Sequence, residues 1–314
     1  MPRPHGTFKS PDRWDRFLQL QLRSARSAVF TASPPPLRYD SQCMGLDANA
    51  VTFLLHAQAS GVRFDRTATL GRQRLFPTSE MLNKSLARFG YTNPIEPDLY
   101  AESLLRLLGA ASIRSIDASA YEGATDLVDL NIPIPAAFKQ QFTAVIDGGT
   151  LEHVFNFPVA IRNAMEMVAE GGHYLAISPT NNYAGHGFYQ FSAELYFRIF
   201  SEENGFRLVR MLLYDDRPSA RWYEVIDPRV LGRRATLINR RPTRLAVLAE
   251  RFAAREIFTL QPIQSDYEIA WRRQVPSRTH LPPFLNRLWR LLPGDWRHAL
   301  AGGRNAYRRF DPNA

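Results

Sequence analysis

Three carboxylates in the middle of this 314-residue chain each close a short apolar segment. They are Asp117, Asp129 and Asp147, which follow the segments 112–116, 125–128 and 142–146. In a sheet of parallel strands, ligands bind beyond the carboxyl ends of the strands. A carboxylate at such an end accepts hydrogen bonds from ribose hydroxyls or an adenine amine, although acids that cap turns are also common there. Three such acids in register favour a nucleoside site.

Two histidines are candidate general bases. His153 follows Asp147 by six residues, directly after Glu152, and His186 lies between two glycines farther along. The pKa of histidine suits removal of a proton at neutral pH, and Glu152 is placed to orient His153. The alternatives stay open: His153 holds a strand–helix turn by hydrogen bonds, and His186 is a polar residue on a moving turn.

The sequence lacks the residues that several other kinds of site require. The single cysteine, Cys43, excludes an internal disulfide and a clustered cysteine metal site. The remaining histidines show no metal-ligand spacing, so we expect no metal. The sequence also has no Gly-Lys-Ser/Thr phosphate loop, no Gly-x-Ser-x-Gly nucleophile turn and no Gly-x-Gly-x-x-Gly step typical of NAD enzymes.

Short apolar segments alternate with amphipathic ones in the middle of the chain. We expect strands at 66–70, 112–116, 125–128, 142–146, 173–178, 206–213 and 245–251, and helices at 11–30, 47–60, 98–108, 157–168 and 193–203. This alternation predicts parallel pairing through right-handed crossovers.

The fold class that follows is α/β, a doubly wound, mostly parallel Rossmann-like sheet. We expect this domain at 63–255, with an irregular insert at 76–97 and a second insert at 216–243. A helical N-terminal extension at 1–62 and a basic C-terminal extension at 256–314 flank it.

The most specific pattern lies in Phe142–Pro179. It consists of a strand, Asp-Gly-Gly, a Leu-Glu-His turn, a helix, Gly-Gly and another strand. This segment resembles the class I S-adenosylmethionine-dependent methyltransferases, whose fourth strand is often followed by a Glu-His-Val step. The segment Gly185–Phe206 looks like the substrate-side loop and next helix of a bacterial branch of that superfamily, methyltransferase type 11 or 23.

The resemblance implies S-adenosylmethionine as cofactor and methyl transfer to oxygen or nitrogen of a small-molecule or sugar-containing acceptor. It assigns Asp117 to the ribose, Asp129 and Leu130 to the adenine, and 147–149 to the pocket near the methyl group. The full set of cofactor residues that it implies is Leu70, Gly71, Arg72, Gln73, Asp117, Ala118, Asp129, Leu130, Asp147, Gly148 and Gly149.

The loop after the first expected strand differs from the pattern of the family. In the family it leads into a Gly-x-Gly-x-Gly loop, whereas this chain has Leu70-Gly71-Arg72-Gln73. Gly71 still permits one tight turn, and Arg72 or Gln73 is placed to hold the cofactor's carboxylate by its side chain. The competing interpretation is a catalytically inactive methyltransferase-like scaffold.

The last part of the chain is basic. Residues 272–314 hold nine arginines and two acids, which gives +7 of the net charge of +9. Leucines, tryptophans and arginines at helical spacing in 281–309 predict an amphipathic helix, interrupted at Pro293-Gly294. Such a tail either contacts an anionic membrane surface or a protein, or packs on the core with its arginines in water. We expect no nucleic-acid partner. No apolar run spans a membrane and residues 1–13 lack a secretory signal, so we expect a cytoplasmic protein.

Overall fold

The computed structural model of the chain describes residues 45–218, 220–273 and 306–312. The chain divides into two units, 1–43 and 44–314, and the second is described here. The expected helix at 11–30 and most of the basic tail lie outside the described residues. Within the described part, no helix is both long and apolar enough to cross a bilayer.

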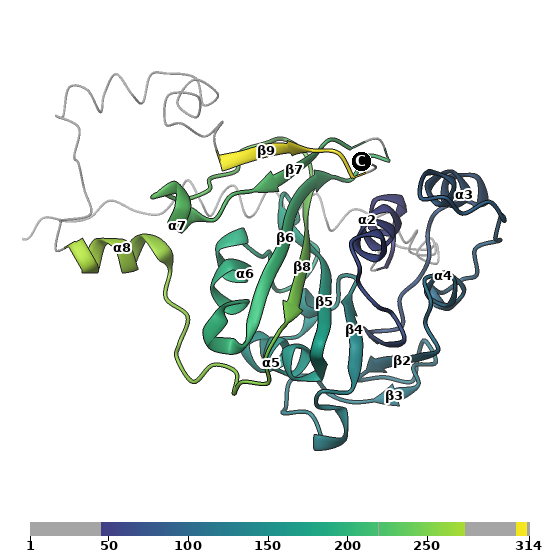
Figure 1. The fold of residues 1–314 in the computed structure, drawn as a ribbon, viewed down its shortest axis with the longest axis horizontal. Coiled ribbons are helices and arrows are strands. Elements are labelled where there is room, and N and C mark those ends of the chain that lie inside the picture. Colours follow the sequence, from purple (N-terminus) through teal and green to yellow (C-terminus); the bar gives the residue numbers. More distant parts are fainter. Residues whose placement is uncertain (1–44, 219, 274–305, 313–314) are drawn as a thin grey trace, which may run out of the picture. The chain divides into compact units, whose positions relative to one another are not determined.

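One mixed sheet organises the described residues (Figure 1). Its nine strands lie in the order β3-β2-β1-β4-β5-β8-β6-β7-β9. They are β1 Arg66–Leu70, β2 Ser112–Asp117, β3 Asp126–Leu127, β4 Phe142–Asp147, β5 Val168–Asn181, β6 Phe206–Asp215, β7 Trp222–Val225, β8 Thr243–Arg251 and β9 Tyr307–Phe310. The strands β1 to β5 pair in parallel, and every later pairing is antiparallel.

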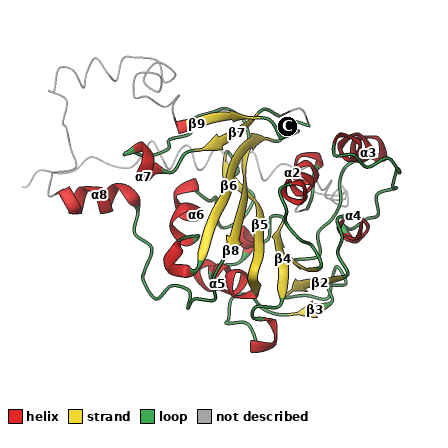
Figure 2. Cartoon of the chain, in the orientation of Figure 1, coloured by secondary structure: helices red, strands yellow, loops and turns green. Residues whose placement is uncertain are grey.

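Helices cover both faces of this sheet (Figure 2). They are α2 Ala48–Ala59, α3 Ser79–Arg88, α4 Glu102–Leu107, α5 Phe157–Met167, α6 Ala193–Ile199, α7 Pro228–Leu231 and α8 Ser265–Arg273, with 3₁₀ turns η1 Ala136–Phe138, η2 Leu151–His153 and η3 Glu202–Asn204. Successive residues of β5 face opposite sides, since Tyr174 packs with α5 and α6 whereas Leu175 packs with α2 and α4. The prediction of a doubly wound α/β fold with a parallel core is therefore confirmed.

The central strands are buried because they are apolar on both faces. All six residues of β4 are buried, as expected for a parallel strand covered by helices on each side. The strand β8 enters between β5 and β6 and runs antiparallel to both. Alternation along the chain predicted its existence but not its direction, because the direction depends on the connection that precedes it.

Several sequence-based boundaries need correction. The helix α2 belongs to the sheet unit and not to an N-terminal extension ending at 62, because its apolar residues pack with Ile146 and Ile177. The insert at 76–97 is not irregular throughout. It contains α3, which Thr78 caps by accepting a hydrogen bond from the amide of Met81. The amphipathic helix expected up to Arg309 is wrong at its end, since Tyr307–Phe310 pairs with β7 as β9.

Candidate functional site

The carboxyl edge of the parallel strands is where the candidate site residues lie. The chain runs from β1 outward to β2 and β3, and then returns to place β4 and β5 on the other side of β1. This reversal makes β1 and β4 neighbours, with Leu70 in register with Asp147. Ligands of doubly wound sheets bind in the crevice at such a reversal.

Gly71 turns the chain tightly at the end of β1, beside Asp117. Its φ is +68°, a left-handed conformation that favours glycine, and its amide donates to the carbonyl of Ile116 at 2.7 Å. A β-carbon on Gly71 would lie 3.8 Å from Oδ2 of Asp117, and Oδ1 of Asp117 accepts a bond from the amide of Ser119. A half-buried carboxylate therefore lies beside the loop that follows β1.

Arg72 is committed to other contacts. Its Nε lies 2.7 Å from Oε1 of Glu102, its Nη1 donates to the carbonyl of Glu122, and its guanidinium stacks 4.0 Å above the ring of Tyr100. An arginine held by a carboxylate, a carbonyl and an aromatic face is not free to bind a cofactor carboxylate. The structure therefore opposes that hypothesis for Arg72.

Gln73 lies in the crevice between β1 and β4. Its side chain is buried, and its Nε2 donates to the carbonyl of Leu70. Its Oε1 has no hydrogen-bond partner among the described residues. A β-carbon on Gly148 would stand 2.1 Å from that oxygen, so any larger residue at position 148 would displace the Gln73 side chain. The amide oxygen of Gln73 is thus a buried polar atom without a partner near the end of β1.

The other two strand-end acids stabilise turns. Asp147 is fully buried. Its Oδ1 accepts bonds from the amides of Gly149 and Thr150, and its Oδ2 accepts one from the hydroxyl of Tyr174. Burial, and then the charge of Glu152, raise the pKa of Asp147 to about 7. With no exposed carboxylate surface, Asp147 fits the alternative of a turn acid better than contact with a cofactor.

Asp129 is exposed. Its Oδ1 accepts bonds from the backbone and side-chain nitrogens of Asn131, and the backbone bond foremost lowers the pKa of Asp129. Its neighbour Leu130 is buried in the core, while Ala118 is exposed beside Asp117. Of the three acids, only Asp117 combines partial exposure with a position at the reversal of strand order.

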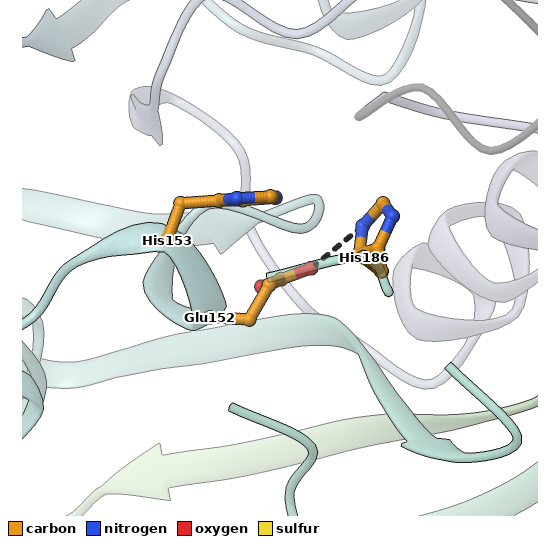
Figure 3. A group of neighbouring side chains, drawn as sticks. All are labelled: Glu152, His153 and His186. Atoms are coloured by element: carbon orange, nitrogen blue, oxygen red, sulfur yellow. Dashed lines mark ion pairs between the residues drawn. The ribbon is translucent and has the colours of Figure 1, made fainter. Parts of the chain in front are cut away.

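Glu152, His153 and His186 come together beyond β4 and β5 (Figure 3). Glu152 and His153 belong to the turn η2, and both side chains point toward His186 on the loop after β5. Oε1 of Glu152 lies 3.5 Å from Nε2 of His186. The two imidazole centroids are 5.0 Å apart. The three candidate catalytic residues are thus neighbours, and we call them the Glu152–His153–His186 cluster.

Burial favours the neutral form of one histidine of this cluster. The Glu152 side chain is 1% exposed, and burial lowers the pKa of His153. The lowered pKa favours the neutral imidazole, the form that accepts a proton. The turn also links the cluster to the crevice, because a β-carbon on Gly71 would lie 3.0 Å from Oγ1 of Thr150.

A buried polar network beside the cluster was missed at the sequence level. Arg244, at the start of β8, donates through Nε to the hydroxyl of Tyr183 at 2.8 Å and pairs with Asp216 at 3.0 Å. The Tyr183 ring lies 5.5 Å from that of His186. Two features of the sequence indicate this network: the acid Asp216 follows the apolar strand β6, and Arg244 directly precedes the apolar run of β8.

No protein-family model and no curated protein matches this chain. Solved structures of other proteins are similar in fold, among them the following three. A 1,6-didemethyltoxoflavin-N1-methyltransferase from Burkholderia thailandensis, with bound S-adenosylhomocysteine, is 12% identical over 80% of this chain and 94% of that one, at a TM-score of 0.38.

The second is a branched-chain polyamine synthase from Thermus thermophilus, with N4-aminopropylspermidine and 5′-methylthioadenosine. It is 14% identical over 80% of this chain and 67% of that one, at a TM-score of 0.39. The third, the N-methyltransferase NodS from Bradyrhizobium japonicum, is 13% identical over 64% and 94%, at a TM-score of 0.35. Likenesses of this order do not show what the chain binds, so its function is argued from its own residues.

Proposed function

We propose that the chain is an S-adenosylmethionine-dependent methyltransferase that acts in the cytoplasm on oxygen or nitrogen of a small-molecule or sugar-containing acceptor. The observation that supports this function is the position of the turn at residues 148–153. One end of the turn lies against Gly71, whose loop faces Asp117, and the other end carries the Glu152–His153–His186 cluster. A nucleoside-binding acid and candidate proton acceptors therefore share one edge of the sheet, where a cofactor and an acceptor would meet.

Two residues fit the cofactor at the crevice. The carboxylate of Asp117 would bind the ribose hydroxyls, because it is half-buried at the end of β2 and its Oδ2 lies beside the Gly71 loop. The buried, unpartnered Oε1 of Gln73 is an acceptor for the α-ammonium group of the methionine moiety. When bound, S-adenosylmethionine supplies an electrophilic methyl group.

The cluster would deprotonate and orient the acceptor. His153 or His186 accepts the proton of a hydroxyl or amine as its oxygen or nitrogen attacks. Glu152 lies close enough to His186 to stabilise the imidazolium that results. Holding the two reactants in line is the larger contribution, since proximity and orientation supply much of the rate in such bimolecular reactions.

Calorimetric titration with S-adenosylmethionine tests the proposal. Asp117→Ala should weaken binding by roughly tenfold or more, because the ribose hydroxyls would lose their acceptor. A factor of ten in affinity corresponds to about 1.4 kcal/mol. The matched control is Asp65→Ala, which removes an exposed acid just before β1, at the opposite edge of the sheet. Absence of binding by the wild-type chain at millimolar cofactor would overturn the function, and equal affinities of the two variants would overturn the role of Asp117.

The second candidate function is a catalytically inactive scaffold that binds a protein or membrane surface through residues 272–314. The packing of Gln73 against Gly148 favours it, since that side chain fills the crevice where the methionine moiety would lie. The same titration separates the two functions: a folded wild-type chain without affinity for S-adenosylmethionine is the result that a scaffold predicts.

A further inference from the structure

The Glu152–His153–His186 cluster combines one carboxylate with two imidazoles. One potential ligand atom from each residue lies within 4.8 Å of the other two, and Figure 3 shows the side chains directed toward a common space. We propose that Glu152, His153 and His186 bind a divalent transition metal ion of the Zn²⁺ type. Spacing along the chain predicts no metal, because His186 lies on a separate loop.

Two residues of the cluster carry buried polar atoms that lack partners. Oε2 of Glu152 and Nε2 of His153 are both buried and have no hydrogen-bond partner among the described residues. A buried carboxylate oxygen that lacks a donor is costly. A bound cation would satisfy this oxygen and the free imidazole nitrogen together.

Glycines let the backbone pack closely around the cluster. Gly149 has φ +98°, and a β-carbon there would lie 3.1 Å from Oε1 of Glu152. On the other side, the amides of Phe188 and Tyr189 donate to the carbonyl of Glu152 at 2.9 and 3.2 Å. These backbone bonds fix the loop that carries His186 against the residue that supplies the carboxylate, so the cluster is preorganised.

The donor set suits Zn²⁺ or a similar ion. Two imidazoles and one carboxylate can together bind a cation, and imidazole nitrogen is a good ligand for Zn²⁺, Fe²⁺ and Co²⁺. Metal–ligand bonds of about 2.1 Å require small rotations of the side chains to close around the ion. Three protein ligands leave an open position, as in catalytic zinc sites. With both imidazoles bound to the ion, an acceptor hydroxyl at that position would have a lowered pKa and release its proton to water, in place of the transfer to His153 or His186. Only this last role rests on the proposed methyl transfer.

Metal titration of the full chain tests the site. Protein stripped with a chelator is titrated with Zn²⁺ by calorimetry and with Co²⁺ by visible absorption, which reports the ligand geometry. We expect one ion per chain, and roughly 100-fold weaker affinity in Glu152→Gln and His186→Ala, since each removes one of three ligands. The matched control is His173→Ala, on the amino-terminal half of β5, which should leave the affinity unchanged.

Two results would overturn the site: no binding of either ion by the folded wild-type chain, or the same affinity in wild type, Glu152→Gln and His186→Ala. Circular dichroism of each variant establishes that it is folded. Titration with S-adenosylmethionine in the presence of the chelator keeps the two proposals separate. If the chain binds the cofactor but no metal, the proposed function is supported and the metal site is overturned. If it binds metal but no cofactor, the metal site is supported and the proposed function is overturned.

Discussion

Gly187 approaches the backbone of Glu152 so closely that a β-carbon on Gly187 would stand 2.9 Å from the carbonyl oxygen of Glu152. That oxygen accepts two backbone bonds from the same loop, from Phe188 and Tyr189. The contact is with backbone atoms, which cannot rotate away as a flexible side chain can. The loop after β5 therefore has one favoured position over the turn η2.

Gly187→Ala should destabilise the chain because the added methyl group displaces this loop. Forcing extra atoms into a packed contact costs about 1–3 kcal/mol, and urea unfolding measures the change. Gly185→Ala is the matched control in the same loop, since a β-carbon on Gly185 has no heavy atom within 4 Å. Its cost should stay within about 0.5 kcal/mol, as at other open surface positions. Equal stabilities of the two variants would contradict the close approach.

Removal of the Asp216 carboxylate should lower the free energy of unfolding much more than removal of the neighbouring Asp215 carboxylate. Asp216 compensates Arg244, whose side chain is 9% exposed, whereas Asp215 pairs with Arg217, which is 50% exposed. Asp216→Ala leaves a buried guanidinium without its hydrogen-bonded carboxylate, and only the more distant carboxyl group of Asp47 still acts on its charge. The cost is typically about 3–5 kcal/mol for a fully buried pair. We expect roughly 2–3 kcal/mol here, because Asp216 itself is 31% exposed.

The matched control for this prediction is Asp215→Ala, which should cost about 1 kcal/mol or less because water screens an exposed ion pair. Both free energies of unfolding come from the same urea titrations. Equal costs for the two substitutions would show that Arg244 does not depend on Asp216.

The parallel core could be predicted from the sequence because its strands are short apolar runs that end in turn residues. Phe142–Asp147 has no competing periodicity, and its strand boundaries match the expectation closely. The helix α3 was missed because Pro94 and Pro97 lie nearby, although Thr78 and the buried Leu82 and Leu86 carry a capping and spacing signal. Antiparallel insertion of β8 depends on which edge of β5 is free, which no local pattern encodes.

The candidate site was only partly predictable for a related reason. An acid after a strand looks the same whether it faces a ligand or caps a turn. Tyr174 and the amides after Asp147 decide that Asp147 caps a turn. The distance between Glu152 and His186 follows from the fold of the loop between residues 182 and 188 and not from sequence spacing. The sequence alone makes Arg72 a candidate anion ligand, because it does not show that Glu102 and Tyr100 hold the guanidinium.

The buried carboxyl group of Asp147 should make stability depend on pH. Burial raises its pKa in the folded chain to about 7, from the ordinary value of 3.8. Between these two values the folded chain keeps a proton that the unfolded chain has released. The stability associated with the protonated group is therefore fully present below about pH 4 and is lost as the pH rises through 7.

Asp147→Asn should remove this component while keeping the shape of the side chain. Its amide oxygen still accepts the bonds from residues 149 and 150, and its nitrogen can donate to Tyr174. Urea unfolding of wild type and variant between pH 4 and 8, with chelator present, measures the difference in free energy. We expect that difference to shift in favour of the variant as the pH rises from 4 to 7 and then to level off. Asp65→Asn, an exposed acid with the same loss of charge, controls for the change in net charge. A difference between wild type and Asp147→Asn that stays constant across this range would show that Asp147 is ionised in the folded chain throughout.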